Sequence, residues 1–360
     1  MTGLLPEGFH DRLPPHADAA ARLERRVLDV AHAHGYEQVD PPLAEFEASL
    51  SQRLKAGRVS DAVRFVDPVS QESLAIRPDM TAQVGRIAAT RMAHHPRPVR
   101  LSYAGAVLKL RASELRPARA MRQIGCELIG LDSVAAAREI VGVAVEALTA
   151  AGVSGLAIDF TLPDLLDAIG GDVPDELRDR LDAKDAAGVA AIDPAYLPLI
   201  EAAGPFADAI ERLRGGPHGA ALATRLEGLA AIADALPDSV ALTLDPTERH
   251  GFEYQSWLGF SIFASGIRDE IGRGGSYAVM HERGAEEAAI GFSLYPDAIL
   301  DAGLASGERR RLFVPVGTDS AAAAALRGKG WVTVAALTPD DTPEAQLCTH
   351  RLTEQGPVAI

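Results

Sequence analysis

The spacing of apolar residues along the chain predicts a helix first and strands after it. Residues 18–34 carry Leu23, Val27 and Val30 at helical spacing, and Gly35 follows as a C-cap. A long amphipathic helix is therefore expected near the start of the chain.

Apolar runs then predict two short strands, a second helix and two longer strands. Pro78 and Asp79 favour a helix start, with Asp79 as the N-cap of a helix over residues 80–92. Residues 111–119 are polar and rich in arginine, so we expect them to form a long loop between antiparallel strands. The predicted strands are residues 64–66, 74–76, 99–110 and 121–129.

A block with helical spacing interrupts the strand-rich pattern. It follows a helix at 135–150 and a strand at 156–161, and it covers residues 163–238, which are rich in Ala, Leu, Asp and Glu. We interpret this block as an all-helical insertion. Strand signals return at residues 240–244, 253–264 and 274–279, and residues 288–294 lead into a last helix.

The pattern changes again after residue 310, to a strand, a helix and a strand at residues 312–316, 320–326 and 331–337. The chain is thus expected to have a core over residues 1–310 and a small α/β unit over residues 311–360. The predicted fold class is α+β, a mostly antiparallel sheet with flanking helices.

Composition, charge and cysteine content limit which partners, compartment and cofactors are expected. The formal net charge of −15 opposes partners whose affinity depends on neutralising phosphates, so tRNA is not an expected partner. No apolar run is long enough to span a bilayer and residues 1–10 lack a signal-peptide pattern, so we expect a cytoplasmic protein. Cys126 and Cys348 lack close companions and are read as reduced thiols, so neither a metal nor a cofactor is expected.

Three short segments carry candidate chemistry, each with an ordinary structural alternative. The glycine-rich residues 272–277 suit either a ligand contact or a tight turn. Asp79 and Thr81 suit either an ammonium group or helix capping. Strand alternation places Gln123 and Glu127 on one face, which is either a polar site or a solvated surface. Walker, dinucleotide-binding, hydrolase-elbow and zinc-protease motifs are absent from the sequence.

Taken in order, these segments resemble the class II aminoacyl-tRNA synthetase core, and specifically the histidyl enzyme, over residues 5–300. Residues 5–11 resemble the family's P-x-G-x-x-D entry, and residues 74–83 its R-P-E-x-T segment, with Asp79 in place of glutamate. The family's Q-x-G-x-E-x-x-G is matched by Gln123, Gly125, Glu127 and Gly130. Its G-G-R-Y-D and R-G-L-D-Y-Y segments are matched in part by residues 274–278 and 250–255.

Departures from the family pattern fall on the groups that handle ATP. Lys109 and Arg111 stand where the family has the arginine and glutamate of F-R-x-E, and Ala298 replaces the arginine that ends G-x-E-R. His250 replaces a further arginine, and the chain lacks a full anticodon-binding domain. Adenylation needs cations around the phosphates, so these positions indicate a degenerate ATP site.

A histidyl-synthetase-like chain with these losses resembles the regulatory subunits of ATP phosphoribosyltransferase, an enzyme of histidine biosynthesis. The resemblance implies a non-catalytic protein that dimerises through its core, forms a hetero-oligomer with the short-form catalytic subunit and mediates allosteric regulation, supporting activity and feedback inhibition by histidine. It also implies a histidine pocket, with Asp79 and Thr81 at the ammonium and Gln123, Glu127, Tyr254 and Tyr277 near the carboxylate and imidazole.

Several points stay open at the level of sequence. Histidine could bind in the synthetase-like pocket or at the subunit interface. The alternatives to a regulatory subunit are a divergent class II ligase that adenylates an amino acid or small acid, and a stand-alone amino-acid sensor.

Overall fold

The computed structural model describes residues 4–51, 62–111, 118–171, 173–249, 255–281, 284–303 and 310–360. The chain divides into two compact units, Met1–Ala305 and Ser306–Ile360. Among the described residues, no helix combines the length and apolar character needed to cross a membrane.

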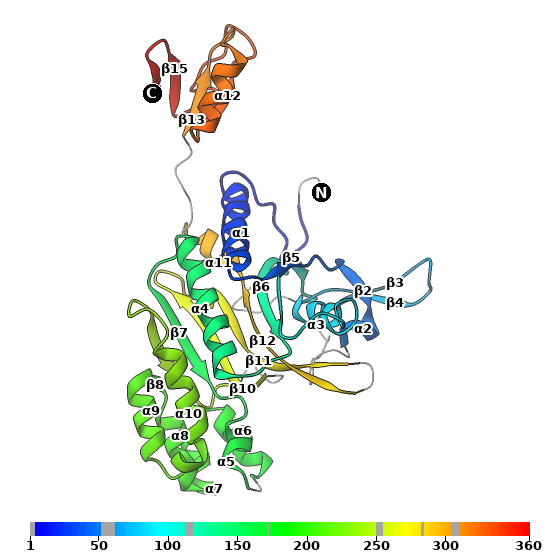
Figure 1. Cartoon of the computed structure of the whole chain (residues 1–360), viewed down its shortest axis with the longest axis vertical. Coiled ribbons are helices and arrows are strands. Elements are labelled where there is room, and N and C mark those ends of the chain that lie inside the picture. The colour runs from blue at the N-terminus through cyan, green and yellow to red at the C-terminus, as the bar shows by residue number, and fades with distance from the viewer. Residues whose placement is uncertain are drawn as a thin grey trace. The chain divides into compact units, whose positions relative to one another are not determined.

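The first unit is a mixed sheet with helices on both faces (Figure 1). Its helices, as far as the chain is described, are α1 (His16–Ala33), α2 (Glu47–Ser51), α3 (Thr81–Ala89), α4 (Val134–Ala150), α5 (Leu165–Ile169), α6 (Asp175–Asp182), α7 (Ala186–Ile192), α8 (Leu197–Glu201), α9 (Phe206–Gly215), α10 (Gly219–Ala233) and α11 (Pro296–Asp301), with the 3-10 helix η1 (Pro194–Tyr196).

The strands of this unit within the described residues are β1 (Glu37–Gln38), β2 (Ala44–Phe46), β3 (Val63–Val66), β4 (Ser73–Ile76), β5 (Val99–Leu108), β6 (Ala120–Ile129), β7 (Leu156–Thr161), β8 (Gly204–Pro205), β9 (Ala241–Leu244), β10 (Gln255–Ala264), β11 (Gly272–Met280) and β12 (Glu286–Leu294). The large sheet has the order β1-β5-β6-β12-β11-β10-β7-β9-β8, and a small sheet has the order β2-β4-β3. All pairs from β5 to β7 in the large sheet are antiparallel.

Alternation along β6 assigns its side chains to two cores. Ile124, Cys126 and Leu128 join the core that α1 and α4 build on one face of the sheet. Met121 and Ile129 join a second core on the other face, with Met80, Val84 and Ala88 of the α3 region. The second face is called the α3 face below, and it carries the candidate site.

Helix α3 is shorter than predicted and begins one residue later. The sequence predicted a helix over residues 80–92, but α3 ends at Ala89, and Met80 occupies its N-cap position. Arg97 donates hydrogen bonds to the Ala88 and Met92 carbonyl oxygens, which fixes the chain as it leaves the helix. Asp79 was predicted as the N-cap; it lies one residue earlier, although its carboxylate still accepts from Thr81 N.

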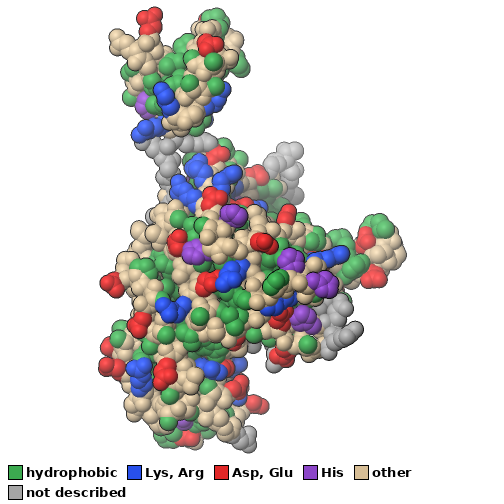
Figure 2. All heavy atoms as spheres, in the orientation of Figure 1, with side chains coloured by type: hydrophobic (Ala, Val, Ile, Leu, Met, Phe, Trp, Pro, Cys, Tyr) green, Lys and Arg blue, Asp and Glu red, His purple; other side chains and the backbone are tan. Residues whose placement is uncertain are grey.

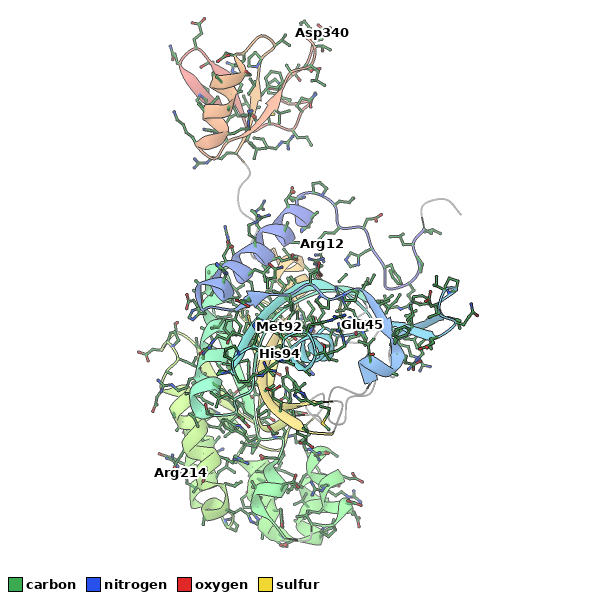
Figure 3. The ribbon with its side chains drawn as sticks, turned by 45° about the vertical axis from the view of Figure 1, so that its right-hand side comes forward. Arg12, Glu45, Met92, His94, Arg214 and Asp340 are labelled. Atoms are coloured by element: carbon green, nitrogen blue, oxygen red, sulfur yellow. The ribbon has the colours of Figure 1, made fainter. Side chains whose placement is uncertain are left out.

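Charged contacts tie α3 to the small sheet. Glu45, labelled in Figure 3, accepts from Arg86 Nε at 2.8 Å and from Gln83 Nε2 at 2.9 Å. Buried Arg77 donates to the carbonyl oxygens of Pro41 and Ala106 at 2.7 and 2.8 Å. These bonds hold the start of α3 over β5.

The second unit, among its described residues, consists of β13 (Arg311–Val314), α12 (Ser320–Gly328), β14 (Val332–Ala335), β15 (His350–Thr353) and β16 (Gly356–Ala359), with sheet order β14-β13-β15-β16. The strand, helix and strand predicted here correspond to β13, α12 and β14. The hairpin β15–β16 was not predicted from the sequence. Leu312, Phe313, Val314 and Cys348 are buried in this unit.

Candidate functional site

A row of glycines crosses the α3 face of the sheet and ends at Glu127. Strand register places Gly259 opposite Gly275, Gly275 opposite Gly291, and Gly291 opposite Glu127. Without side chains on these residues another group can approach the backbone closely. A Cβ added at Gly291 would lie 1.7 Å from Glu127 Oε2, so the glutamate side chain rests on this glycine floor.

Glu127 is held by two tyrosines in a fully buried position. The hydroxyl of Tyr103 donates to Glu127 Oε1 at 2.9 Å, and that of Tyr277 donates to Oε2 at 2.8 Å. Burial raises the pKa of Glu127 to about 8, although the two hydroxyl donors act in the opposite direction. Burial and the neighbouring Glu127 likewise raise the pKa of Tyr103 well above its usual value. At neutral pH the Glu127 carboxyl is therefore mostly protonated.

A second group of polar side chains joins β6 to the start of α3. Asp79 Oδ1 accepts from Thr81 N at 2.7 Å, and Asp79 Oδ2 accepts from Gln123 Nε2 at 2.6 Å. Gln123 also donates to Ser293 Oγ at 2.8 Å and accepts from Met80 N at 2.9 Å. The amide of Gln123 is thus bonded to partners from the start of α3 and from β12.

A small cavity lies between these two groups. The residues that line it come from α3, β6, β10, β11, β12 and the adjoining loops, namely Asp79, Thr81, Glu127, Gln255, Arg273, Gly274, Gly275, Tyr277, Gly291, Phe292, Ser293 and Tyr295. Its volume is about 20 Å³, room for one water molecule. A larger ligand can enter only if the lining side chains separate.

The charge around the cavity favours a cationic, donor-rich ligand. Asp79 and Glu127 present carboxyl oxygens to it. The guanidinium of Arg273 is held by Glu270 through bonds of 2.7 and 2.8 Å, which offsets its charge. Because the Glu127 carboxyl is mostly protonated and Arg273 is paired with Glu270, Asp79 is the residue of this lining whose carboxylate favours a cationic ligand.

The structure brings together five of the six residues predicted for the pocket: Asp79, Thr81, Gln123, Glu127 and Tyr277. Tyr254 lies outside the described residues, as does His250. The alternative that Gln123 and Glu127 belong to a solvated surface is wrong, because α3 covers this face and leaves them 0% and 1% exposed.

Sequence reasoning missed Tyr103 and assigned no role to Ser293 or Arg273. It placed Gln255 at the pocket, as a departure from the synthetase pattern there. Tyr103 and Ser293 both lie opposite Gly125 in the register and meet at 3.1 Å above it. Alternation along β5 indicates the face on which Tyr103 lies. The sequence does not reveal the cross-strand register that brings it to Glu127.

The three positions predicted to form a degenerate ATP site do not line this cavity. Lys109, directly after β5, donates its backbone N–H to the Arg119 carbonyl oxygen and accepts from Arg119 Nε, and Arg111 is exposed. Ala298 lies in α11 and packs against the core under α1. None of these described residues lines the cavity.

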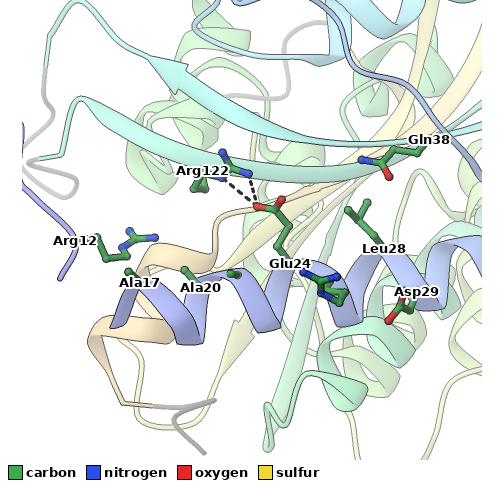
Figure 4. A pocket seen from close by; sticks show the side chains of 10 residues that line it. Arg12, Ala17, Ala20, Glu24, Leu28, Asp29, Gln38 and Arg122 are labelled. Carbon is green, nitrogen blue, oxygen red and sulfur yellow. Dashed lines mark hydrogen bonds and ion pairs between the residues drawn. The ribbon is translucent and has the colours of Figure 1, made fainter. Parts of the chain in front are cut away.

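A larger cavity, about 530 Å³, lies on the opposite face of the sheet beside α1 (Figure 4). Arg122 crosses it to Glu24, with a 3.0 Å bond from Nε, and Arg12 pairs with Asp297. Two of its three arginines are therefore already held in ion pairs. Acidic and basic side chains are also interspersed over the molecular face in Figure 2.

The sequence is similar to two related groups of proteins. Residues 8–299 match the family model described as histidyl-tRNA synthetase. Proteins named ATP phosphoribosyltransferase regulatory subunit match nearly the whole chain. The relative from Paramagnetospirillum magneticum is 42% identical, covering 99% of this chain and 98% of its own, and that from Rhodospirillum centenum is 41% identical over 96% and 94%.

Solved structures share the fold. A Bacillus halodurans protein described as an ATP phosphoribosyltransferase regulatory subunit/histidyl-tRNA synthetase superposes with a TM-score of 0.76 at 22% identity, covering 96% of each chain. A Nostoc histidyl-tRNA synthetase gives 0.75 at 14% identity, covering 98% of this chain and 91% of its own. The predicted α+β, class II synthetase-like fold is confirmed.

Proposed function

The chain belongs to the ATP phosphoribosyltransferase regulatory subunits, and from this premise we propose that it binds the short-form catalytic subunit, supports its activity and makes it sensitive to histidine. It is a regulatory subunit and not the catalytic enzyme. The short form of the partner and the response to histidine are the parts that this proposal adds.

The proposed histidine site is the cavity between α3 and the glycine floor. The observation that carries this assignment is a buried polar network beside that cavity, Gln123–Ser293–Tyr103–Glu127, to which the partly buried Asp79 is bonded through Gln123. The members are paired with one another, and those that line the cavity have oxygen atoms that can accept or donate further hydrogen bonds to a polar ligand. Asp79 and Thr81 are assigned to the ammonium group, and Gln123, Glu127, Tyr254 and Tyr277 to the carboxylate and imidazole.

The small volume of the cavity makes histidine binding dependent on a change in the arrangement of its lining side chains, and such a change can regulate the complex. Because the described side chains leave about 20 Å³, histidine stabilises an arrangement in which they have separated. If the catalytic subunit favours the contracted arrangement, the two binding events oppose each other. Coupling of this kind is typically about 1–3 kcal/mol.

The chain is also proposed to form a homodimer through its synthetase-like core. Large apolar side chains are exposed on and beside the small sheet, among them Phe46 at 45%, Phe65 at 43% and Val66 at 64%. Contiguous apolar surface of this kind is typical of protein interfaces. Light scattering coupled to size exclusion tests this part, and a monomer at micromolar concentration contradicts it.

The central experiment measures phosphoribosyl transfer from PRPP to ATP by the short catalytic subunit of the same organism, with and without this chain, across a histidine titration. We expect a higher rate in the presence of the chain and inhibition by histidine. If neither rate nor inhibition changes, the proposal is wrong.

One variant distinguishes histidine binding in this pocket from histidine binding at the subunit interface. Asp79→Asn is expected to keep the activation and to weaken inhibition by histidine, because the amide removes the charge that pairs with the ammonium group. Asp238→Asn, at an exposed position between α10 and β9, is the matched control. Full inhibition of the Asp79→Asn complex would place histidine elsewhere.

The alternative of a divergent ligase makes a different prediction. Lys109 and Arg111 depart from the family's phosphate-binding arginine and glutamate, and Ala298 supplies no cation, so we expect no amino-acid-dependent exchange of pyrophosphate into ATP. Robust exchange by the purified chain would favour the ligase.

A further inference from the structure

Strand β14 lies at the edge of the four-stranded sheet of the second unit. The sheet order is β14-β13-β15-β16, so β14 and β16 are its outer strands. Val332 N donates to Arg310 O at 3.1 Å, which shows that the even-numbered residues of β14 bond to β13. Because alternate residues of such a strand face opposite edges, the backbone N–H and C=O groups of Thr333 and Ala335 point away from the sheet. Among the described residues no further strand pairs with them.

The two outer strands differ in how they resist pairing with another strand. Strand β16 contains Gly356 and Pro357, and a proline has no N–H group to offer to a neighbouring strand. Strand β14 has the sequence V-T-V-A, without a charged residue, proline or glycine. Natural edge strands usually carry such a residue, which prevents association with other chains. Strand β14 is therefore an edge that is open to one further strand.

The pattern of β14 and its flanks is self-complementary about Val334. A two-fold axis perpendicular to the sheet at this residue makes two copies of β14 antiparallel. Thr333 of one copy then lies opposite Ala335 of the other, and their outward N–H and C=O groups can exchange both hydrogen bonds. The same operation places Leu337, which is 86% exposed, opposite Trp331 of the second copy.

The charges on either side of β14 have the signs that this arrangement requires. Arg327 and Lys329 precede the strand, and Asp340 and Asp341 follow it. In an antiparallel pair, the segment before the strand in one copy lies beside the segment after it in the other, whereas parallel pairing would bring like charges together. Opposite charges at both ends favour association of two identical copies.

Helix α12 allows a second copy to approach. The two-fold axis places both copies of α12 on the same face of the joined sheet. Its exposed residues include Ala321, Ala322, Ala324 and Ala325, whose side chains are small. The distance between two packed helices depends on the side chains at their contact, so an alanine surface permits a short one.

We propose that β14 is a self-association surface, through which the second units of two copies of this chain join into one continuous sheet. The inference depends neither on the proposed histidine site nor on the catalytic subunit. A pair of short strands buries little surface. The proposed homodimer through the core strengthens the pairing, because copies already held in one assembly meet at a high effective concentration.

The test is disulfide formation in the full chain under mild oxidation. Val334→Cys places one thiol on each side of the axis, where the Cα atoms of a non-hydrogen-bonded antiparallel pair are about 4.5 Å apart, within disulfide range. We expect most of this variant to run as a covalent dimer on a non-reducing gel. The wild-type chain, whose Cys126 and Cys348 are buried, should form no such dimer.

Val332→Cys is the matched control. It lies on the same strand and the same face, at a position that is 42% exposed, but its two copies are about 13 Å apart across the axis. This variant should form little covalent dimer. Equal cross-linking of Val332→Cys and Val334→Cys, or no covalent dimer with Val334→Cys, overturns the proposal.

Two further changes interrupt the pairing and leave the bonds to β13 in place. Thr333→Pro removes an outward N–H group, and Ala335→Lys adds a charge to the open edge at an exposed position. Each change, added to Val334→Cys, is expected to slow cross-linking roughly tenfold. Cross-linking that neither change slows would show that the thiols meet by another route, and the proposed strand pairing would be wrong.

Discussion

Glu127 is the residue whose environment departs furthest from that of an ordinary surface carboxylate. Its pKa is raised from 4.5 to about 8, chiefly by burial. Between pH 4.5 and about pH 8, Glu127 is deprotonated in the unfolded chain but still protonated in the folded chain. The contribution of this group to stability is therefore fully present below pH 4.5 and is lost as the pH rises, at up to about 1.4 kcal/mol per pH unit.

Glu127→Gln is expected to flatten the pH dependence of stability, because an amide resembles the protonated carboxyl group and does not titrate. Urea unfolding from pH 5 to pH 8 should show the variant gaining stability relative to the wild type as the pH rises. Glu211→Gln, on the exposed face of α9 (Phe206–Gly215), should leave the wild-type profile unchanged. A constant difference between Glu127→Gln and wild type across this range would contradict the burial argument.

A glycine at residue 291 is predicted to be essential for the stability of the fold, because the Glu127 side chain packs directly on it. Gly291→Ala places a methyl group 1.7 Å from Glu127 Oε2 and 2.7 Å from the Cys126 carbonyl oxygen, so both the side chain and the backbone must shift. We expect a loss of about 2–4 kcal/mol in the free energy of unfolding, from overpacking and broken bonds to Glu127.

The control for this change is Gly142→Ala in the middle of α4, where nothing lies within 4 Å of the added Cβ. Alanine favours a helix interior, so this variant should gain up to about 1 kcal/mol. If both variants are as stable as the wild type in chemical denaturation, the tight packing of Glu127 on the floor is wrong.

At the scale of elements, the helical insertion is connected to the segment that precedes the pocket strand β10. Lys184, in the turn between α6 and α7, donates to Asp245 Oδ1 at 2.7 Å and Thr247 Oγ1 at 2.6 Å. Arg249 pairs with Asp182 of α6 at 3.3 Å. Lys184 has a φ of 56°, an unfavourable conformation for a lysine, which these bonds help to maintain.

Lys184→Met is expected to loosen this segment without unfolding the domain. The ion pair is partly exposed, so its loss should cost no more than about 1 kcal/mol. Amide hydrogen exchange should accelerate locally over residues 245–249. Lys329→Met, an exposed lysine of the second unit, is the control, and unchanged exchange in the Lys184 variant would show that the insertion does not restrain this segment.

Most elements were predictable because their periodicity is strong. The helices α1 and α4 and the strands β5, β6 and β7 lie within a few residues of their predicted bounds, since their apolar positions repeat at 3.6 or 2 residues. The hairpin β15–β16 was missed, as its residues, from His350 to Ala359, are mixed in polarity and half-exposed. The bulge in β10 between Gln255 and Gly259 leaves no periodic signal at all.

At the scale of the whole molecule, each of the two units has its own buried apolar residues. Leu312, Phe313 and Val314 are buried within the second unit, whereas the large core clusters belong to the first. A chain ending at residue 305 is therefore expected to keep the main unfolding transition, with a melting temperature within a few degrees of the full chain by circular dichroism. A large fall, or aggregation of the shortened chain, would mean that the first unit depends on the second.

The order of the elements, the resemblance to the synthetase core and the departures from its pattern at residues 109, 111 and 298 could all be read from the sequence alone, because periodicity and residue type are local properties. The sequence also named Asp79, Gln123 and Glu127. The burial of Gln123 and Glu127 follows from the tertiary structure alone, since it depends on α3 covering this face of the sheet.

Tertiary structure alone also decided which residues meet at the site. Register across four strands brings Tyr103, Tyr277 and Gly291 to Glu127, and a bulge turns Gln255 over Gly275. Strand register arises from long-range pairing, in which a shift of one residue would reverse every side chain. No local feature of the sequence encodes those contacts.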